Sequence, residues 1–109
     1  MTGGRLADYL DHMRQAAADA CGFVEYMDKS AFLADKRTQQ AVAMSLIVLG
    51  EAATKVMERH AAFAETHSHI SWRGMRGMRN RIAHGLEVVW DTMQTALPEL
   101  RAQLAALNG

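Results

Sequence analysis

The sequence has little of several residue types, and each scarcity excludes a class of protein. Among 109 residues there is one cysteine, Cys21, so an internal disulfide and a zinc site built on several thiolates are both excluded. One proline and a hydrophobic content of 50% exclude a disordered chain. Aromatic residues are 6% of the chain and β-branched runs are almost absent, which disfavours a β-sheet. A folded, helical protein is expected.

Net charge is also absent, because 12 basic and 12 acidic side chains balance. No global field therefore attracts nucleic acid or a membrane. The charges are unevenly distributed, however, since no acidic residue lies between Glu65 and Glu87. That interval contains a concentrated set of cationic and titratable side chains: Arg73, Arg76, Arg79, Arg81, His67, His69 and His84.

The length fits one compact domain, residues 1–109, with no room for a second. The longest apolar run, around Met44 to Leu49, is much shorter than the roughly 20 residues that span a bilayer. The first residues show no signal-like pattern of charge followed by an apolar stretch. We expect a cytoplasmic protein that does not contact a membrane.

Apolar residues at spacings of three and four predict amphipathic helices. The first is expected over Leu6–Met27, and the second has its apolar positions over Val42–Met57. Ser30 is predicted to cap the chain that follows the break between them. Gly50 lies inside the second helix, where it predicts close approach of another helix or a partner. Residues 60–71 lack a clean period and are interpreted as a connection.

A third helix is predicted over residues 72–84, with Ser71 as its N-cap. Gly85 is suited to end that helix in a left-handed conformation. A last helix follows over residues 86–107, and Pro98 is expected to kink or divide it. The fold class predicted from these segments is all-α, an antiparallel bundle of four to five helices.

The third helix contains the residues best suited to chemistry. Arg76, Asn80 and His84 are each four residues apart, which is about 40° around a helix axis, so they would form one ridge. Arg79 lies five residues before His84, roughly 140° away. One helix would therefore present Arg79 and His84 in different directions. A two-fold dimer through this helix would bring both groups to one cleft.

Cleavage of RNA by its own 2′-hydroxyl fits these groups, because that reaction needs proton transfer and charge stabilisation but no metal or cofactor. His84 would exchange the protons near neutral pH. Arg79 would pair with phosphate oxygens through its planar fork. Asn80 would fix the imidazole tautomer or hold a phosphate oxygen. Salt-sensitive contacts to flanking phosphates are predicted for three further residues, Arg73, Arg76 and Arg81.

The string from Gly77 to His84, Gly-Met-Arg-Asn-Arg-Ile-Ala-His, resembles the active-site motif of the HEPN superfamily, specifically the HepT-like toxin ribonucleases. Their hallmark is Arg, four to six residues, then His. Other parts of the chain agree in order with that family: Leu49-Gly50-Glu51-Ala52-Ala53, Trp72, Trp90 and Leu97-Pro98-Glu99-Leu100.

The resemblance implies a HEPN-like helical bundle that dimerises through its motif-bearing helix. It also implies a ribonuclease toxin paired with a small nucleotidyltransferase antitoxin of the MNT type. Arg79 and His84 take the catalytic positions of the family motif, and Asn80 supports them.

The segment after His84 departs from the family pattern. HepT-like proteins usually have a tyrosine two residues after the histidine, which their antitoxin modifies with AMP, whereas this sequence has Leu86. Relatives also have a tyrosine-containing stretch before a Leu-x-Val-Val-Trp segment, and here that segment follows Gly85 directly. Either several residues have been lost, or a loop is missing from the sequence as given.

Other interpretations of the same residues remain open. The chain would also suit a non-catalytic module that acts with a nucleotidyltransferase and holds nucleotide or protein phosphate on residues 73–81, or a purely structural dimer. A structural ion pair with an arginine of the third helix is expected for Glu51. The remaining expectations are solvated histidines without metal at His67 and His69, packing or dimer contacts at Met75 and Met78, and core positions for Trp72 and Trp90.

Overall fold

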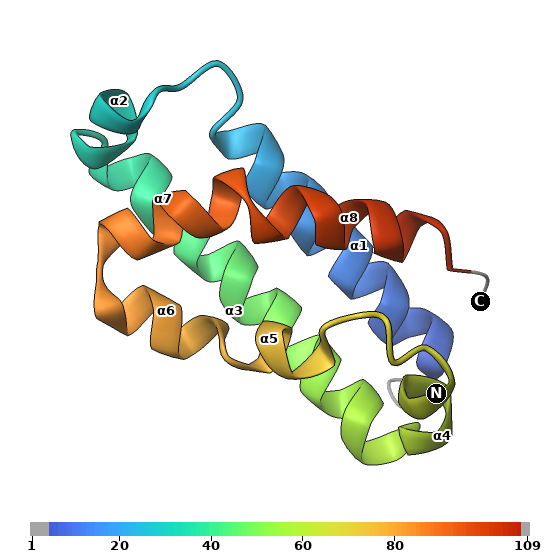
Figure 1. Ribbon diagram of the computed structural model, residues 1–109. Helices are drawn as coiled ribbons and strands as arrows, with labels where there is room; N and C mark the ends of the chain where they lie inside the picture. The colour runs from blue at the N-terminus through green and yellow to red at the C-terminus, as the bar shows by residue number, and fades with distance from the viewer. Residues whose placement is uncertain (1–4, 108–109) are drawn as a thin grey trace.

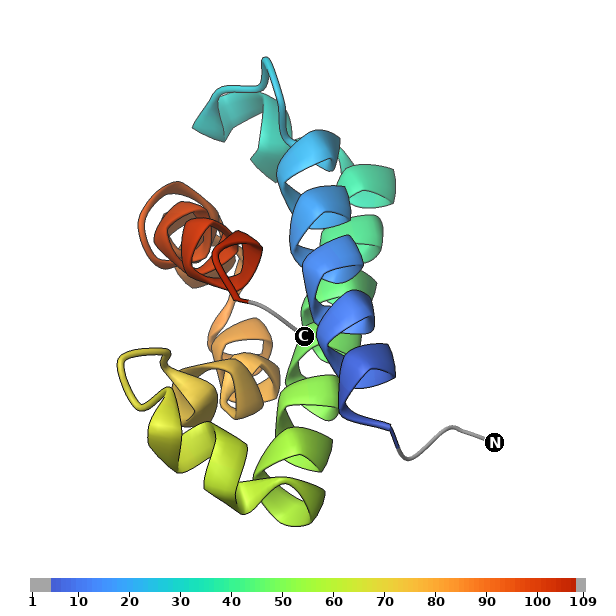
Figure 2. The same cartoon turned by 90° about the vertical axis from the view of Figure 1, so that its right-hand side faces the viewer.

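The computed structural model describes residues 5–107, and all regular secondary structure in that range is helical. Two long antiparallel helices, α1 (Leu6–Phe23) and α3 (Lys36–Arg59), form one layer, and the chain after α3 packs on one face of it (Figures 1 and 2). The shorter helices are α2 (Lys29–Leu33), α4 (Ala61–Thr66), α5 (Trp72–Arg76), α6 (Met78–His84), α7 (Leu86–Gln94) and α8 (Ala96–Ala105). The all-α helical bundle predicted from sequence is confirmed.

Aspartates begin α2 and α3. The predicted cap at Ser30 is wrong, because the Asp28 carboxylate accepts the backbone N–H of Ala31 at 2.8 Å and caps α2. Asp35 caps α3 by accepting from both the hydroxyl and the backbone N–H of Thr38. These two hydrogen bonds, the hydroxyl bond first, lower the pKa of the Asp35 carboxyl.

Two boundaries differ from the prediction near the ends of the long helices. The first helix ends at Phe23 rather than Met27, since Gly22, a poor helix former, lies just before a turn. Residues 60–71 are not a plain connection, because they contain α4. That helix buries only Ala64, so its apolar period was too short to detect.

The predicted continuous helix over residues 72–84 is wrong. Gly77 separates α5 from α6, which is consistent with the low helix propensity of glycine. The predicted cap at Ser71 is also wrong, since its side chain makes no capping hydrogen bond to α5. Gly85 ends α6 with φ 123° and ψ 170°, a positive-φ conformation that suits glycine but is not the left-handed helical one expected.

The division of the last helix is confirmed. The helix α7 ends at Gln94 and α8 begins at Ala96, just before Pro98. Pro98 has no N–H to donate to the Gln94 carbonyl four residues earlier, and its ring would clash with that carbonyl. The helix therefore breaks at Thr95.

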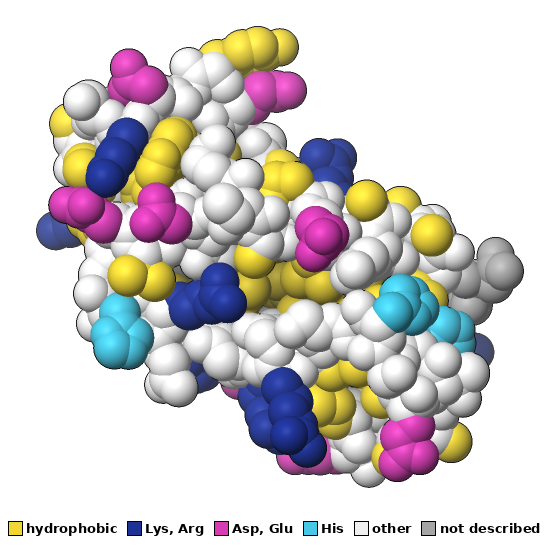
Figure 3. Space-filling model, viewed as in Figure 1, with side chains coloured by type: hydrophobic (Ala, Val, Ile, Leu, Met, Phe, Trp, Pro, Cys, Tyr) yellow, Lys and Arg dark blue, Asp and Glu magenta, His cyan; other side chains and the backbone are white. Residues whose placement is uncertain are grey.

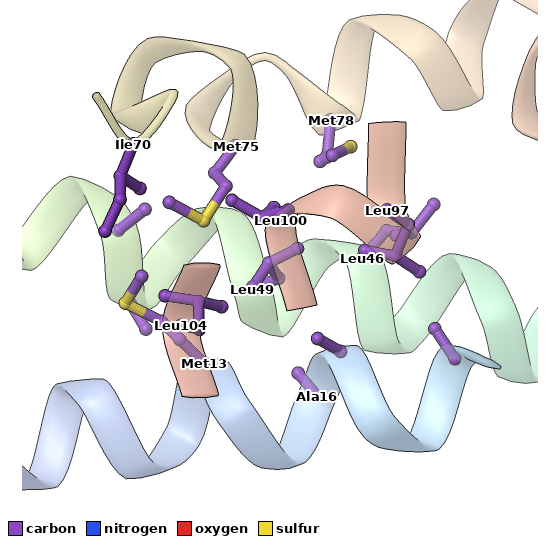
Figure 4. Packing of buried hydrophobic residues seen from close by; sticks show 14 of the residues in the cluster. Met13, Ala16, Leu46, Leu49, Ile70, Met75, Met78, Leu97, Leu100 and Leu104 are labelled. Carbon is purple, nitrogen blue, oxygen red and sulfur yellow. The ribbon is translucent and has the colours of Figure 1, made fainter. Parts of the chain in front are cut away.

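A single hydrophobic core joins the α1–α3 layer to the helices that pack on it. Figure 4 shows Met75 and Met78 pointing from the α5–α6 segment into side chains of α3 and α8, including Leu49 and Leu100. The predicted close approach at Gly50 is confirmed, since a Cβ there would lie 2.7 Å from the Met75 carbonyl oxygen. Trp72 and Trp90 are core residues, 6% and 9% exposed.

The helix α3 is long and apolar enough to cross a membrane by length and composition alone. In the structure it is the central helix of the core, because it packs against α1, α5 and α6. Its buried side chains are Val42, Ser45, Leu46, Leu49, Ala52, Ala53 and Val56. A core helix of a bundle has the same composition as a membrane span.

Candidate active site

The motif predicted from sequence lies on α6, a helix of seven residues that runs from Met78 to His84. Such a short helix is not stable alone, so tertiary contacts must hold it. Met78 is 2% exposed and Ile82 is half-buried, and these two side chains attach α6 to the core. The polar side chains of the motif lie on the remaining sides of the helix.

Arg79 faces α3. Its Nε lies 3.4 Å from Oε2 of Glu51, which confirms the expected ion pair between Glu51 and an arginine of this segment. Both side chains are well exposed, 65% for Arg79 and 62% for Glu51. Exposed pairs of this kind contribute about 0–1 kcal/mol, so little free energy opposes transfer of the Arg79 guanidinium to a phosphate.

Asn80 and His84 lie one turn apart on α6, and both are exposed. Within residues 5–107, neither side chain has a hydrogen bond or ion pair, so Asn80 does not orient the His84 imidazole in this structure. His84 is the last residue of α6. Because it is exposed at the end of this helix, its imidazole is accessible to a large ligand.

The ridge predicted from Arg76 through Asn80 to His84 is interrupted, because Arg76 ends α5 and the other two belong to α6. Arg73 and Arg76 are exposed, and no side-chain partner is found for either of them among the described residues. Figure 3 shows Lys or Arg side chains over the α5–α6 segment, on the face also occupied by α7 and α8. Arg73 also borders a shallow hollow of about 380 Å³ beside Trp72.

Arg81 differs from the other cations of the segment. Its side chain is half-buried, and Nη1 donates a hydrogen bond to Oγ1 of Thr92 on α7 at 3.0 Å. Sequence reasoning missed this partner. The available signal was a threonine three residues after Val89, on the apolar side of the predicted helix, where a buried hydroxyl needs a hydrogen-bond partner.

His67 and His69 lie away from the motif, in the connection between α4 and α5. The ring of His67 packs on Phe63 with centroids 4.1 Å apart, and its Nδ1 lies 3.0 Å from the Phe63 carbonyl oxygen. No group of three or more side chains suited to hold a metal occurs in the part of the chain that the structure describes.

The sequence matches a known protein family over most of its length. Residues 13–107 match the family model described as ribonuclease HepT-like. The chain is 30% identical over 106 residues to a probable ribonuclease HepT of Thermococcus cleftensis, covering 93% of this chain and 94% of that protein. It is 33% identical over 98 residues to a putative RNase of Methanocaldococcus jannaschii, covering 85% and 75%. No solved structure is a significant match.

Proposed function

Because this chain belongs to the HepT-like ribonuclease family, we propose that it is a metal-independent endoribonuclease with its active site on α6. The nuclease class follows from the family. The observation that supports the site is the exposed set on one short helix, Arg79, Asn80 and His84, of which only Arg79 has a partner, in a weak ion pair.

The proposed reaction is attack of an RNA 2′-oxygen on the adjacent phosphorus. The bond between the 2′-oxygen and phosphorus forms while the bond from phosphorus to the 5′-oxygen breaks, which leaves a cyclic phosphate and a 5′-hydroxyl. His84 takes the 2′-hydroxyl proton as a base or gives a proton to the leaving oxygen as an acid. Arg79 leaves Glu51 and pairs with the non-bridging oxygens as their charge grows.

In a single step, one histidine cannot both accept the proton of the 2′-hydroxyl and donate a proton to the leaving 5′-oxygen. A second copy of the chain, related by a two-fold axis near α6, would supply a second His84 and a second Arg79. We therefore propose a homodimer whose cleft contains both motifs. Arg73 and Arg76, exposed and unpartnered among residues 5–107, would hold the flanking phosphates of the RNA.

The biological role we propose is that of a cytoplasmic toxin with an MNT-type nucleotidyltransferase as its antitoxin. In this chain the residue two positions after His84 is Leu86, which has no hydroxyl. AMP cannot be attached there, so the partner would act through another residue or through binding alone. Leu86 and Val88 lie next to the motif, and their side chains are 39% and 37% exposed. Such a partner would bind at these two side chains.

The test is cleavage of RNA by the purified protein with a chelator present. We expect cutting without added metal, cyclic phosphate at the new 3′ ends, and a loss of about 10²- to 10⁴-fold in rate for His84→Ala. The protein should sediment at twice the 12.0 kDa of one chain. Cleavage by His84→Ala at the wild-type rate would overturn the assignment. Binding to a nucleotidyltransferase without any cleavage would favour the non-catalytic module instead.

A further inference from the structure

Gly85 is the single residue that connects α6 to α7 along the chain, and we call His84, Gly85 and Leu86 the α6–α7 corner. The Gly85 N–H donates to the Ile82 carbonyl at 3.2 Å, and the Gly85 carbonyl accepts from the Val89 N–H at 3.2 Å. Glycine is free to rotate about both of its backbone dihedrals, so this joint by itself does not fix the angle between the two helices. Contacts outside Gly85 fix that angle: Met78 of α6 and Val89, Trp90 and Met93 of α7 pack in the same core, and one polar contact links the two helices directly.

The hydrogen bond between Arg81 and Thr92 crosses this corner. Thr92 is 2% exposed, and its hydroxyl donates to the Val88 carbonyl at 2.8 Å. A hydroxyl has one proton, so this donation leaves a lone pair to accept the Arg81 N–H at 3.0 Å. The direction of the Thr92 hydroxyl is therefore determined by α7 itself, and it holds the Arg81 guanidinium in one place.

Other polar links near the corner are weaker. Lys29 of α2 pairs with Glu87 at 3.0 Å, but these side chains are 47% and 71% exposed. The pair of Arg79 and Glu51 is exposed to a similar degree and ties α6 to α3, not to α7. Exposed ion pairs add little, whereas a hydrogen bond to a buried hydroxyl is costly to leave unmade.

We propose that Arg81 is a positioning residue: through Thr92 it closes the α6–α7 corner and so sets the direction of His84, the last residue of α6. This inference rests on the proposed function for its kinetic consequence, but not for its structural one. It assigns Arg81 a role other than the phosphate contact expected from the sequence. Arg79 and Arg81 are two residues apart, about 200° around the helix, so one faces α3 and the other α7.

The direct test is Thr92→Val, which keeps the shape of the side chain and removes the hydroxyl. The change leaves the half-buried Arg81 guanidinium without its acceptor, so the melting temperature should fall slightly while the protein stays folded. We expect the imidazole NMR signals of His84, assigned by their absence in His84→Ala, to shift or broaden in the RNA-free protein. The rate constant kcat should fall about tenfold, which corresponds to about 1.4 kcal/mol of activation free energy, with KM unchanged.

Two controls separate positioning from phosphate binding. Thr92→Ser keeps the hydroxyl and should retain both kcat and the His84 signals. The double variant Arg81→Ala/Thr92→Val should lower kcat no more than either single change does, because both changes remove the same hydrogen bond. A direct phosphate contact predicts instead that Arg81→Ala raises KM and reduces the salt dependence of RNA binding by about 0.7 per contact, while Thr92→Val behaves as wild type.

The NMR experiment distinguishes the failure of this inference from the failure of the proposed function. Unchanged His84 signals in Thr92→Val would overturn the positioning role, whether or not the protein cuts RNA. Changed signals in a protein that cuts no RNA would support the corner contact and contradict the nuclease site.

Discussion

The α1–α3 layer and the α5–α6 segment differ in how their residues are used. The helix α3 buries eight of its 24 residues and α1 buries six of its 18, in regular stripes that face the core. The helix α6 buries one of seven, and its other side chains include three exposed polar groups. Exposed polar side chains contribute little to folding, so they are free to serve chemistry. Stability and function should therefore be separable by mutation.

The sharpest test of this separation is to change Leu49, which is fully buried on α3. Leu49→Ala should lower the free energy of unfolding by about 2–5 kcal/mol, through lost burial and the cavity left behind. Urea unfolding followed by circular dichroism measures this change. Met44→Ala, at a position on the same helix that is 61% exposed, is the matched control and should change stability by at most about 0.5 kcal/mol.

His84→Ala completes the same comparison from the other side. It should leave the unfolding curve unchanged while it slows cleavage about 10²- to 10⁴-fold. A large loss of stability in His84→Ala, or none in Leu49→Ala, would show that the two regions are not divided in this way.

Gly50 is where the two regions touch, and a smaller effect is expected there. Gly50→Ala places a methyl group 2.7 Å from the Met75 carbonyl oxygen, a backbone atom that moves only if α5 moves. Overpacking should cost about 1–3 kcal/mol and the higher helix propensity of alanine should return about 1 kcal/mol, so we expect a net loss of stability of up to about 2 kcal/mol. Thermal unfolding of the variant measures the difference.

Gly22→Ala is the matched control for this prediction, since a Cβ at Gly22 meets nothing within 4 Å. This change should stabilise the protein by roughly 0.5–1 kcal/mol. If both substitutions stabilise the protein, the close contact between α3 and α5 is not a constraint on the fold.

The smallest effect on stability is expected at the exposed pair of Glu51 and Arg79. Glu51→Gln should change the free energy of unfolding by less than about 1 kcal/mol, because both side chains are mostly solvated. It should nevertheless lower KM for RNA at low salt, since it removes an anion beside Arg79 and frees the guanidinium. Steady-state kinetics at several salt concentrations test this. A higher KM would mean that Glu51 is needed to orient Arg79.

Several features of the fold were predictable because they depend on local physics. The division of the last helix near Pro98 follows from a missing N–H, and the positive φ of Gly85 follows from the absence of a side chain. The helix α4 was missed because only Ala64 marks its buried side. The break at Gly77 was missed because a glycine within a helix is often tolerated, and only the packing of α5 on α3 shows that here it separates two segments.

The sequence predicts which residues belong to the candidate site, but it did not predict which side chains they contact in the structure. The expected pairing of Glu51 with an arginine of this segment is confirmed, yet the sequence did not say which arginine. The buried hydroxyl of Thr92 was not singled out at all, although it determines where the Arg81 guanidinium lies. Asn80 was expected to fix the His84 imidazole or to hold a phosphate oxygen, and among residues 5–107 its side chain makes no hydrogen bond to His84.

The sequence by itself determined the helical class, the resemblance to the HepT-like ribonucleases and the motif from Arg79 to His84, because these depend on residue type and on spacing along the chain. Only the tertiary structure decided that Arg79 faces α3, that Arg81 is tied to α7 and that His84 stands at an open corner. The reason is physical: each partner lies on a different helix, and how those helices pack depends on the shape of the whole core. Spacing along one helix gives the direction of a side chain, and packing decides what that side chain meets.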